Sequence, residues 1–192
     1  MTDMFNPEFD EPLLVECAQW VGRLCNTWAR LELEIVNLCG ALLQAPNDDV
    51  SNAMIQAFDF RAQISAIRLG AVARELPSGW AELIHDEVDY IDQTLRPRRN
   101  RYVHSMWLRS SEGELWRVDQ TPRVYRAQAK QPLSWAGRSV VTETISAIRE
   151  TVAEIDAHGG FVFQLASDLS WPPLPDLAAR LGEQPRRALA RS

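Results

Sequence analysis

The residues best suited to chemistry lie at positions 96–104, where the sequence reads Arg-Pro-Arg-Arg-Asn-Arg-Tyr-Val-His. An imidazole such as that of His104 exchanges a proton near neutral pH and can act as a general base or acid. A guanidinium such as that of Arg99 can donate two parallel hydrogen bonds to phosphate oxygens as negative charge builds up on them. With Asn100 to position them, these groups suit cleavage of a phosphodiester bond in RNA, in which a base removes the proton of a 2′-hydroxyl group.

On a helix, the spacing of these residues would gather them on or beside one face. Asn100 and His104 are four residues apart and therefore share a face, and Trp107 lies close to the same stripe. Arg99 precedes His104 by five residues, a rotation of about 140°, so its guanidinium would stand beside that face. Tyr102 would point to the core and hold the turn in place. We therefore predict Arg99, Asn100 and His104 as the catalytic residues.

The charge of the chain is distributed unevenly around this segment. The 192 residues hold 20 Lys and Arg against 26 Asp and Glu, a net charge of −6. Residues 96–138 nevertheless carry 10 basic and 3 acidic groups, whereas residues 1–95 carry 5 basic and 16 acidic groups. Positive charge gathered in an acidic chain favours the binding of an anion. The arginines predicted to contact nucleic acid are Arg96, Arg98, Arg101, Arg109, Arg117, Arg123 and Arg126.

Each of these features also has a purely structural interpretation. Arginines at the end of a helix over residues 80–96 would offset the negative pole of its C-terminus. His104 could be a partly buried histidine with a satisfied hydrogen bond. Arginines on edge strands, such as Arg117, Arg123 and Arg126, would discourage aggregation, whereas interleaved with aromatic residues they could bind single-stranded RNA.

The sequence predicts neither a metal site nor a cofactor. No group of His, Cys and carboxylate residues has the spacing of a metal ligand set, and His85 and His158 lie in other segments. We therefore expect cleavage that is independent of metal ions. In-line cleavage uses a base on one side of the phosphorus and an acid on the other, but each chain offers one histidine in this setting. A two-fold homodimer that brings two copies of the motif together would supply both groups.

Three helical segments are expected to precede and position the motif. Leu14, Cys17, Val21, Leu24, Trp28, Leu31, Ile35, Leu38 and Leu42 follow one another at alternating steps of three and four residues. This seam predicts a long helix over residues 12–44 that packs against other helices. A second helix is predicted over residues 50–75, with one stripe through Met54, Phe58, Leu69 and Val72. A third is predicted over residues 80–96, with Glu82, Asp86, Glu87 and Asp89 facing outward.

Beyond Leu95 the pattern changes several times. Pro97 should kink the third helix or start a new one, because it lacks an amide hydrogen. Two strands, 114–118 and 123–127, predict a hairpin inside an insert at about 110–135. Helical spacing resumes at Val141 and continues through Gly159-Gly160 to residue 169. The sequence thus predicts an all-α fold, an up-down bundle of four to five helices with a small β-hairpin, in one domain over residues 1–171. Residues 172–192, rich in Pro and Arg, are predicted to form a loosely ordered tail.

The motif resembles that of the HEPN family (higher eukaryote and prokaryote nucleotide-binding domains). Arg99 is followed directly by Asn100 and is separated by four residues from His104, on the third helix of a predicted bundle, and the resemblance covers about residues 12–170. By this resemblance Arg99 and His104 correspond to the two named positions of the motif, and Asn100 to its commonly polar third position. Met106 departs from one subgroup, which has a tyrosine there that is used for silencing by nucleotidyl transfer.

The resemblance implies a function as well as a fold. Many HEPN proteins are metal-independent endoribonucleases of toxin–antitoxin, abortive-infection or other phage-defence systems, and they act as dimers with facing motifs. The expected activity is therefore RNA cleavage that leaves a 2′,3′-cyclic phosphate, with RNA, a second copy and a cognate antitoxin protein as partners. The alternative is a non-catalytic HEPN-like dimer that binds RNA, a nucleotide or a partner protein.

The remaining features of the sequence concern the compartment. The N-terminal residues lack the basic and apolar regions of a secretory signal, and no apolar run approaches the ~18 residues that span a bilayer. Three cysteines, Cys17, Cys25 and Cys39, lie in one predicted helix without CxxC spacing, so a disulfide framework is not expected. We therefore expect a cytoplasmic protein without membrane contact.

Overall fold

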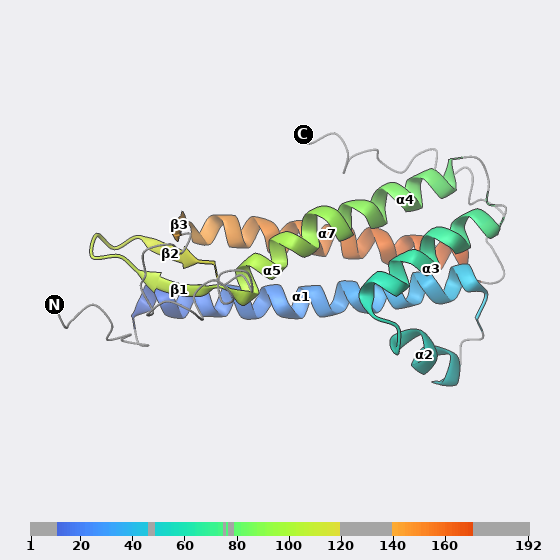
Figure 1. Ribbon diagram of the computed structural model, residues 1–192, viewed down its shortest axis with the longest axis horizontal. Helices are drawn as coiled ribbons and strands as arrows, with labels where there is room; N and C mark the ends of the chain where they lie inside the picture. The colour runs from blue at the N-terminus through green and yellow to red at the C-terminus, as the bar shows by residue number, and fades with distance from the viewer. Residues whose placement is uncertain (1–10, 46–48, 75, 77–78, 120–139, 171–192) are drawn as a thin grey trace, which may run out of the picture. The chain divides into compact units, whose positions relative to one another are not determined.

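The structure is a computed structural model that describes residues 11–45, 49–74, 76, 79–119 and 140–170. These residues are mostly helical, with a small antiparallel sheet of three strands, which confirms the predicted all-α class (Figure 1). The elements are α1 (Pro12–Leu43), α2 (Asp49–Gln56), α3 (Phe60–Ala73), α4 (Trp80–Tyr90), the π-helical turn η1 (Ile91–Leu95), α5 (Arg96–His104), β1 (Met106–Arg109), β2 (Leu115–Val118), β3 (Val140–Glu143) and α7 (Ile145–Leu169). No helix in these ranges is long and apolar enough to cross a membrane.

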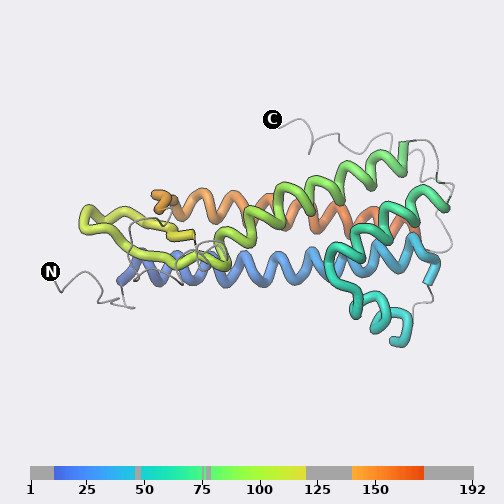
Figure 2. Tube along the Cα trace, viewed as in Figure 1, coloured from blue at the N-terminus to red at the C-terminus, as the bar shows by residue number. Residues whose placement is uncertain are grey.

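The described chain forms two compact units. One comprises residues up to Ala29 together with Gln93–Asp156, and the other comprises Arg30–Asp92 together with the residues from Ala157 onward. The Cα trace in Figure 2 can be followed through each unit by residue number. The first unit contains α5 and the sheet, and the second contains α2, α3 and α4.

The predicted seam of α1 is confirmed almost along its whole length. Cys17, Leu24, Trp28, Leu31, Ile35, Leu38 and Leu42 are buried, whereas Leu14 and Val21 remain partly exposed. Pro12 begins the helix, where a missing amide hydrogen costs nothing. At the other end Gln44 adopts the left-handed conformation with φ of 52°, and the amide of Ala45 donates to the carbonyl of Gly40. This is a usual way to satisfy the last carbonyls of a helix.

The prediction of one helix over residues 50–75 is wrong. Asp59 is extended (φ −66°, ψ 161°), and its side chain accepts a hydrogen bond of 2.8 Å from the amide of Ala62, so it caps a new helix, α3. Gln63 donates from its side chain to the carbonyls of Ile55 and Phe58 and so satisfies the end of α2. These local caps outweigh the continuous apolar period.

Two sets of apolar residues in this region differ in burial. Ile64, Ile67 and Ala71 are buried in the second unit. Met54, Phe58, Leu69 and Val72 are exposed, with 72% of Leu69 accessible, so the stripe that they form does not contribute to the core.

Pro97 has the effect expected of it, because α4 gives way to a widened π-helical turn just before the proline. The turn η1 ends at Leu95, and Pro97 occupies the second position of α5, where its missing amide breaks no regular hydrogen bond. Helix α5 then ends at His104, since Ser105 is extended (φ −92°, ψ 155°). Trp107 therefore lies in β1, and the prediction that it shares a helical face with Asn100 and His104 is wrong.

The sheet has the order β1-β2-β3, with both pairs antiparallel. Trp107 pairs with Arg117, and Trp116 pairs with Thr142. The strand predicted at 114–118 is confirmed as β2, but its two edges are occupied by β1 and β3. The predicted pairing with 123–127 is therefore wrong, and residues 123–127 themselves lie outside the described part of the chain.

The last helix begins later than its apolar spacing indicated. Val141 belongs to β3, and α7 starts at Ile145 because Thr144 caps it, with its side-chain oxygen accepting from the amide of Ala147 at 3.1 Å. From there α7 continues through Gly159-Gly160 to Leu169, as predicted. The tail at 172–192 lies outside the described residues.

Candidate functional site

His104 is the last residue of α5 and its side chain is exposed. The turn that presents it is fixed by its neighbours. The indole of Trp107 donates to the carbonyl of Tyr102 at 3.1 Å, and the hydroxyl of Ser105 donates to the carbonyl of Arg101 at 2.5 Å. Both bonds satisfy carbonyls in the last turn of α5, which would otherwise lack partners. The imidazole thus stands on a helix end that side chains hold in place.

Arg99 lies five residues, about 1.4 turns, before His104 on the same helix, and its guanidinium is held by two neighbours. Its Nη1 donates to the side-chain oxygen of Asn100 at 3.0 Å, and its Cζ lies 5.8 Å from the ring centroid of the buried Trp28 on α1. Its Nε is buried and has no hydrogen-bond partner. A buried donor without an acceptor costs about 1–3 kcal/mol, so the packing of Arg99 is not optimised for stability alone.

The structure thus brings Arg99 and Asn100 into direct contact and places His104 on the same element. Asn100 acts on the guanidinium, as a positioning residue would. The first unit also supplies rigid support, since the ring of Tyr102 is buried and lies 6.0 Å from that of Trp107. Burial, followed by the nearby carboxylate of Glu143, raises the pKa of Tyr102 and so favours its neutral hydroxyl.

The arginines predicted to contact nucleic acid differ in their exposure and in their ion pairs. Arg101 is exposed on α5, and Arg96 is partly buried. Arg98 is ion-paired with Glu154 of α7, and Arg109 of β1 with Glu11 at 3.1 Å. Two further predicted contacts, Arg123 and Arg126, lie outside the described residues.

Arg117 contradicts its predicted role. Its side chain is only 4% exposed and is ion-paired with Asp119 and with Glu143, the latter at 3.0 Å. A guanidinium enclosed by two carboxylates cannot reach a phosphate from outside, so Arg117 stabilises the sheet. Its position in the middle of β2, between buried Leu115 and Val118, places it among residues of the core.

The sequence interpretation missed a buried pair in the second unit. Nδ1 of His158 lies 2.6 Å from a carboxylate oxygen of Glu87, and the two residues are 7% and 6% exposed. The ring of Tyr90 stacks on His158 with centroids 4.8 Å apart. Glu87 was predicted to face outward, and its burial against His158 corrects that prediction.

A signal for this pair was present in the sequence. Glu87 lies three residues after Ile84 and four before Ile91, and His158 lies three residues after Ile155 and four before Val162. Both are therefore polar residues at core positions of helices, and all four apolar neighbours are buried. Polar groups at such positions need partners, and here they are each other's partners.

In the described ranges, no group of three or more His, Cys, Asp or Glu residues could hold a metal ion. Cys17 and Cys39 are free thiols buried among apolar residues, whereas Cys25 is partly exposed. Burial raises the pKa of Cys17 to about 12 and that of Cys39 to about 11. Neither thiol is suited to act as a nucleophile, because the thiolate is the reactive form.

No family model, curated protein or solved structure matches this chain. The functional assignment of α5 accordingly depends on its own residues and geometry.

Proposed function

We propose that this protein is a metal-independent endoribonuclease of the HEPN type, with Arg99, Asn100 and His104 as its site. One observation supports the proposal above others. Helix α5 presents an exposed imidazole at its end and, on the same helix, a guanidinium that Asn100 and Trp28 position and whose buried Nε has no acceptor. Arg99 is only partly buried, so its guanidinium is not enclosed as that of Arg117 is, and it lies on the same helix as an accessible proton-transfer group.

The proposed reaction is transesterification at a phosphodiester bond of RNA. His104 of one copy takes the proton of the 2′-hydroxyl, and the 2′-oxygen attacks phosphorus. Arg99 stabilises the negative charge on the non-bridging oxygens. The bond from phosphorus to the 5′-oxygen breaks, and that oxygen receives a proton from the imidazolium of His104 in the second copy. The products are a 2′,3′-cyclic phosphate and a free 5′-hydroxyl. A homodimer is part of the proposal because each chain supplies one such histidine.

The test is to incubate the purified full-length protein with mixed RNA in EDTA. The wild type should release fragments ending in 2′,3′-cyclic phosphate, and His104→Ala should lower the rate at least about 100-fold. His85→Gln is the matched control, because His85 is a partly buried histidine on α4 in contact with the carbonyl of Arg68. Its rate should equal that of the wild type.

Cleavage that EDTA abolishes, or that His104→Ala retains, contradicts the proposal. RNA bound without product, with an affinity that falls steeply as salt increases, would instead support the alternative of a non-catalytic HEPN-like dimer. Within the proposal, the biological setting is that of a toxin or phage-defence effector with a cognate antitoxin. Co-expression with neighbouring genes that relieve its toxicity would test that setting.

A further inference from the structure

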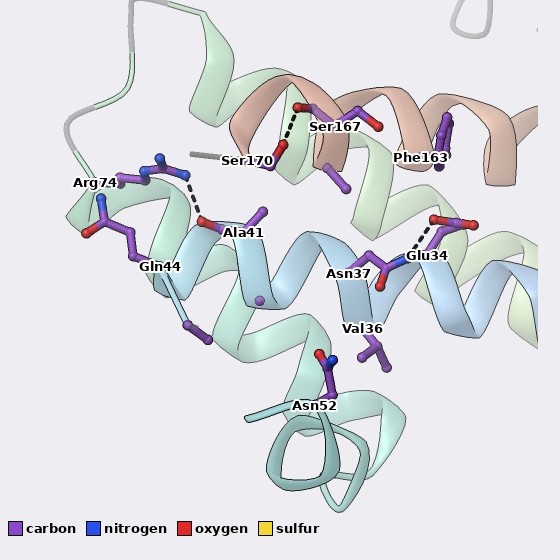
Figure 3. A pocket seen from close by; sticks show the side chains of 13 residues that line it. Glu34, Val36, Asn37, Ala41, Gln44, Asn52, Arg74, Phe163, Ser167 and Ser170 are labelled. Atoms are coloured by element: carbon purple, nitrogen blue, oxygen red, sulfur yellow. Dashed lines mark hydrogen bonds between the residues drawn. The ribbon is translucent and has the colours of Figure 1, made fainter. Parts of the chain in front are cut away.

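A groove of about 850 Å³ lies in the second unit and does not belong to the α5 site. Helix α1 lines it along much of its length, α2 contributes Asn52, and α7 contributes Phe163 and Ser167. Figure 3 shows Glu34, Asn37 and Phe163 at one end of the groove and Arg74 at the other. Its polar side chains come from several elements, so the groove is a shaped surface rather than a gap at one helix end.

The two charged groups of the groove differ in how they are satisfied. Nη1 of Arg74 donates to the carbonyls of Ala41 and Leu169 at 2.8 and 2.9 Å, so this guanidinium is committed to the C-terminal ends of α1 and α7. Glu34 accepts one hydrogen bond, from the side-chain amide of Asn37 at 3.0 Å. Within the described part of the chain, its carboxylate has no cationic partner.

The sequence of the unit that contains the groove is acidic. Residues 30–92 and 157–170 contain 12 Asp and Glu residues and 4 Arg, with no Lys. Helices α1, α3 and α7 also end near Arg74, and each C-terminus adds partial negative charge. Because Arg74 is hydrogen-bonded to backbone carbonyls and Glu34 has no cationic partner among the described residues, the Glu34 end of the groove favours a positively charged ligand.

The other side chains indicate what kind of cation would fit. Phe163 is 55% exposed and lines the same groove as Glu34, so its ring is accessible to a cation. The carbonyl oxygen of Asn37 and the hydroxyl of Ser167 add acceptors for N–H donors. One carboxylate beside an aromatic ring is a poor site for a metal ion, which needs several charged ligands. An elongated groove with an aromatic wall suits an organic ammonium ion.

We propose that this groove binds a small organic polyamine, with one ammonium group between the Glu34 carboxylate and the Phe163 ring and the rest of the chain along α1. This site is separate from α5, and the proposal does not depend on ribonuclease activity.

The test is calorimetric titration of the full-length, RNA-free protein with spermidine at low and moderate salt. Wild type should bind with a stoichiometry near one, and Glu34→Gln should weaken binding about tenfold through loss of the charge pair. Phe163→Leu, which keeps an apolar side chain but removes the ring, should weaken binding about threefold. Both positions are accessible, so thermal unfolding should confirm that both variants fold as the wild type does.

The matched control is Glu82→Gln, which removes one exposed carboxylate from α4 outside the groove. Its affinity should remain within about twofold of wild type, because a distant surface charge is screened. If Glu82→Gln weakens binding as much as Glu34→Gln, spermidine follows net charge alone and the proposal is wrong. The proposal is also wrong if the wild type does not bind spermidine. It is equally wrong if the two single variants, Phe163→Leu and Glu34→Gln, both bind with wild-type affinity.

Discussion

Two histidines of this chain lie in opposite environments. His104 ends α5 with an exposed ring, in the unit that contains the sheet. His158 lies in the middle of α7 in the other unit, 7% exposed, with Nδ1 bonded to Glu87 and its ring stacked on Tyr90. A group that must exchange protons with a substrate needs access, whereas a buried polar group needs a fixed partner. By this comparison, His104 is suited to chemistry and His158 to stability.

Two arginines of the first unit show the same contrast. Arg117 is enclosed by Asp119 and Glu143, and its guanidinium stabilises the sheet through these two ion pairs. Arg99 is positioned by Asn100 and Trp28, yet its buried Nε has no acceptor. A sequence shows only that both are arginines in a basic segment. The difference between them arises from which residues pack around each guanidinium.

The largest expected effect separates the two histidines. His158→Ala leaves the Glu87 carboxylate buried without its partner, so the free energy of unfolding should fall by about 3 kcal/mol. Glu87→Gln keeps a hydrogen-bonding side chain and should cost less. His104→Ala removes an exposed ring and should change the free energy of unfolding by less than about 0.5 kcal/mol. Urea unfolding of the three variants measures this, and equal losses for His104→Ala and His158→Ala would remove the distinction.

A smaller effect should distinguish the two arginines. Arg117→Met leaves two carboxylates without their buried cation and should cost about 2–3 kcal/mol. Arg99→Met keeps the length of the side chain. It loses the hydrogen bond to Asn100 and the contact with Trp28 but also removes a buried donor without an acceptor, so the free energy of unfolding should change by less than about 1 kcal/mol in either direction. Thermal unfolding provides the measurement. If Arg99→Met were the more damaging change, Arg99 would be a structural residue and the proposed site would lose its phosphate-binding group.

The same contrast explains which features the sequence could predict. Helix α1 was predictable because most of its seam from Cys17 to Leu42 is buried, and a buried face appears in the sequence as apolar residues at steps of three and four. The helical placement of the residues of α5 and the irregularity next to Pro97 could also be predicted. The exposure of His104 could not be predicted, because it depends on where α5 ends. The ion pairs of Arg117 could not be predicted either, because one of the two carboxylates comes from β3.

The other errors have a common physical cause. A period of apolar residues does not reveal a cap, and Asp59 and Thr144 each started a helix where the spacing indicated continuity or an earlier start. Glu87 was taken for a surface residue because carboxylates are seldom buried. Its place between Ile84 and Ile91 was the stronger signal, and it needed the imidazole from α7 to become stable there.

The buried cysteines should make the stability of the protein depend on pH in the alkaline range. Because the folded pKa values of about 12 for Cys17 and about 11 for Cys39 lie above the ordinary value of 9.0, the folded state favours the protonated thiols. Their contribution to stability is therefore complete below pH 9 and is lost as the pH rises through 11 and 12. At pH 8, iodoacetamide should modify the partly exposed Cys25 first, and mass spectrometry of timed samples would show it. Early modification of Cys17 would show that the α1 seam opens.

The smallest expected effect concerns the glycines that follow His158. A Cβ at Gly160 would meet nothing within 4 Å, so Gly160→Ala should raise the free energy of unfolding by about 0.5–1 kcal/mol, because glycine is costly inside a helix. Gly70→Ala is the matched control, since its Cβ would lie 3.0 Å from that of Leu42, and it should destabilise the protein. Opposite signs in thermal unfolding would show that α7 is continuous at His158 and needs no flexibility there. A destabilising Gly160→Ala would mean that the chain departs from the helix at this point, and that the pairing of His158 with Glu87 depends on that departure.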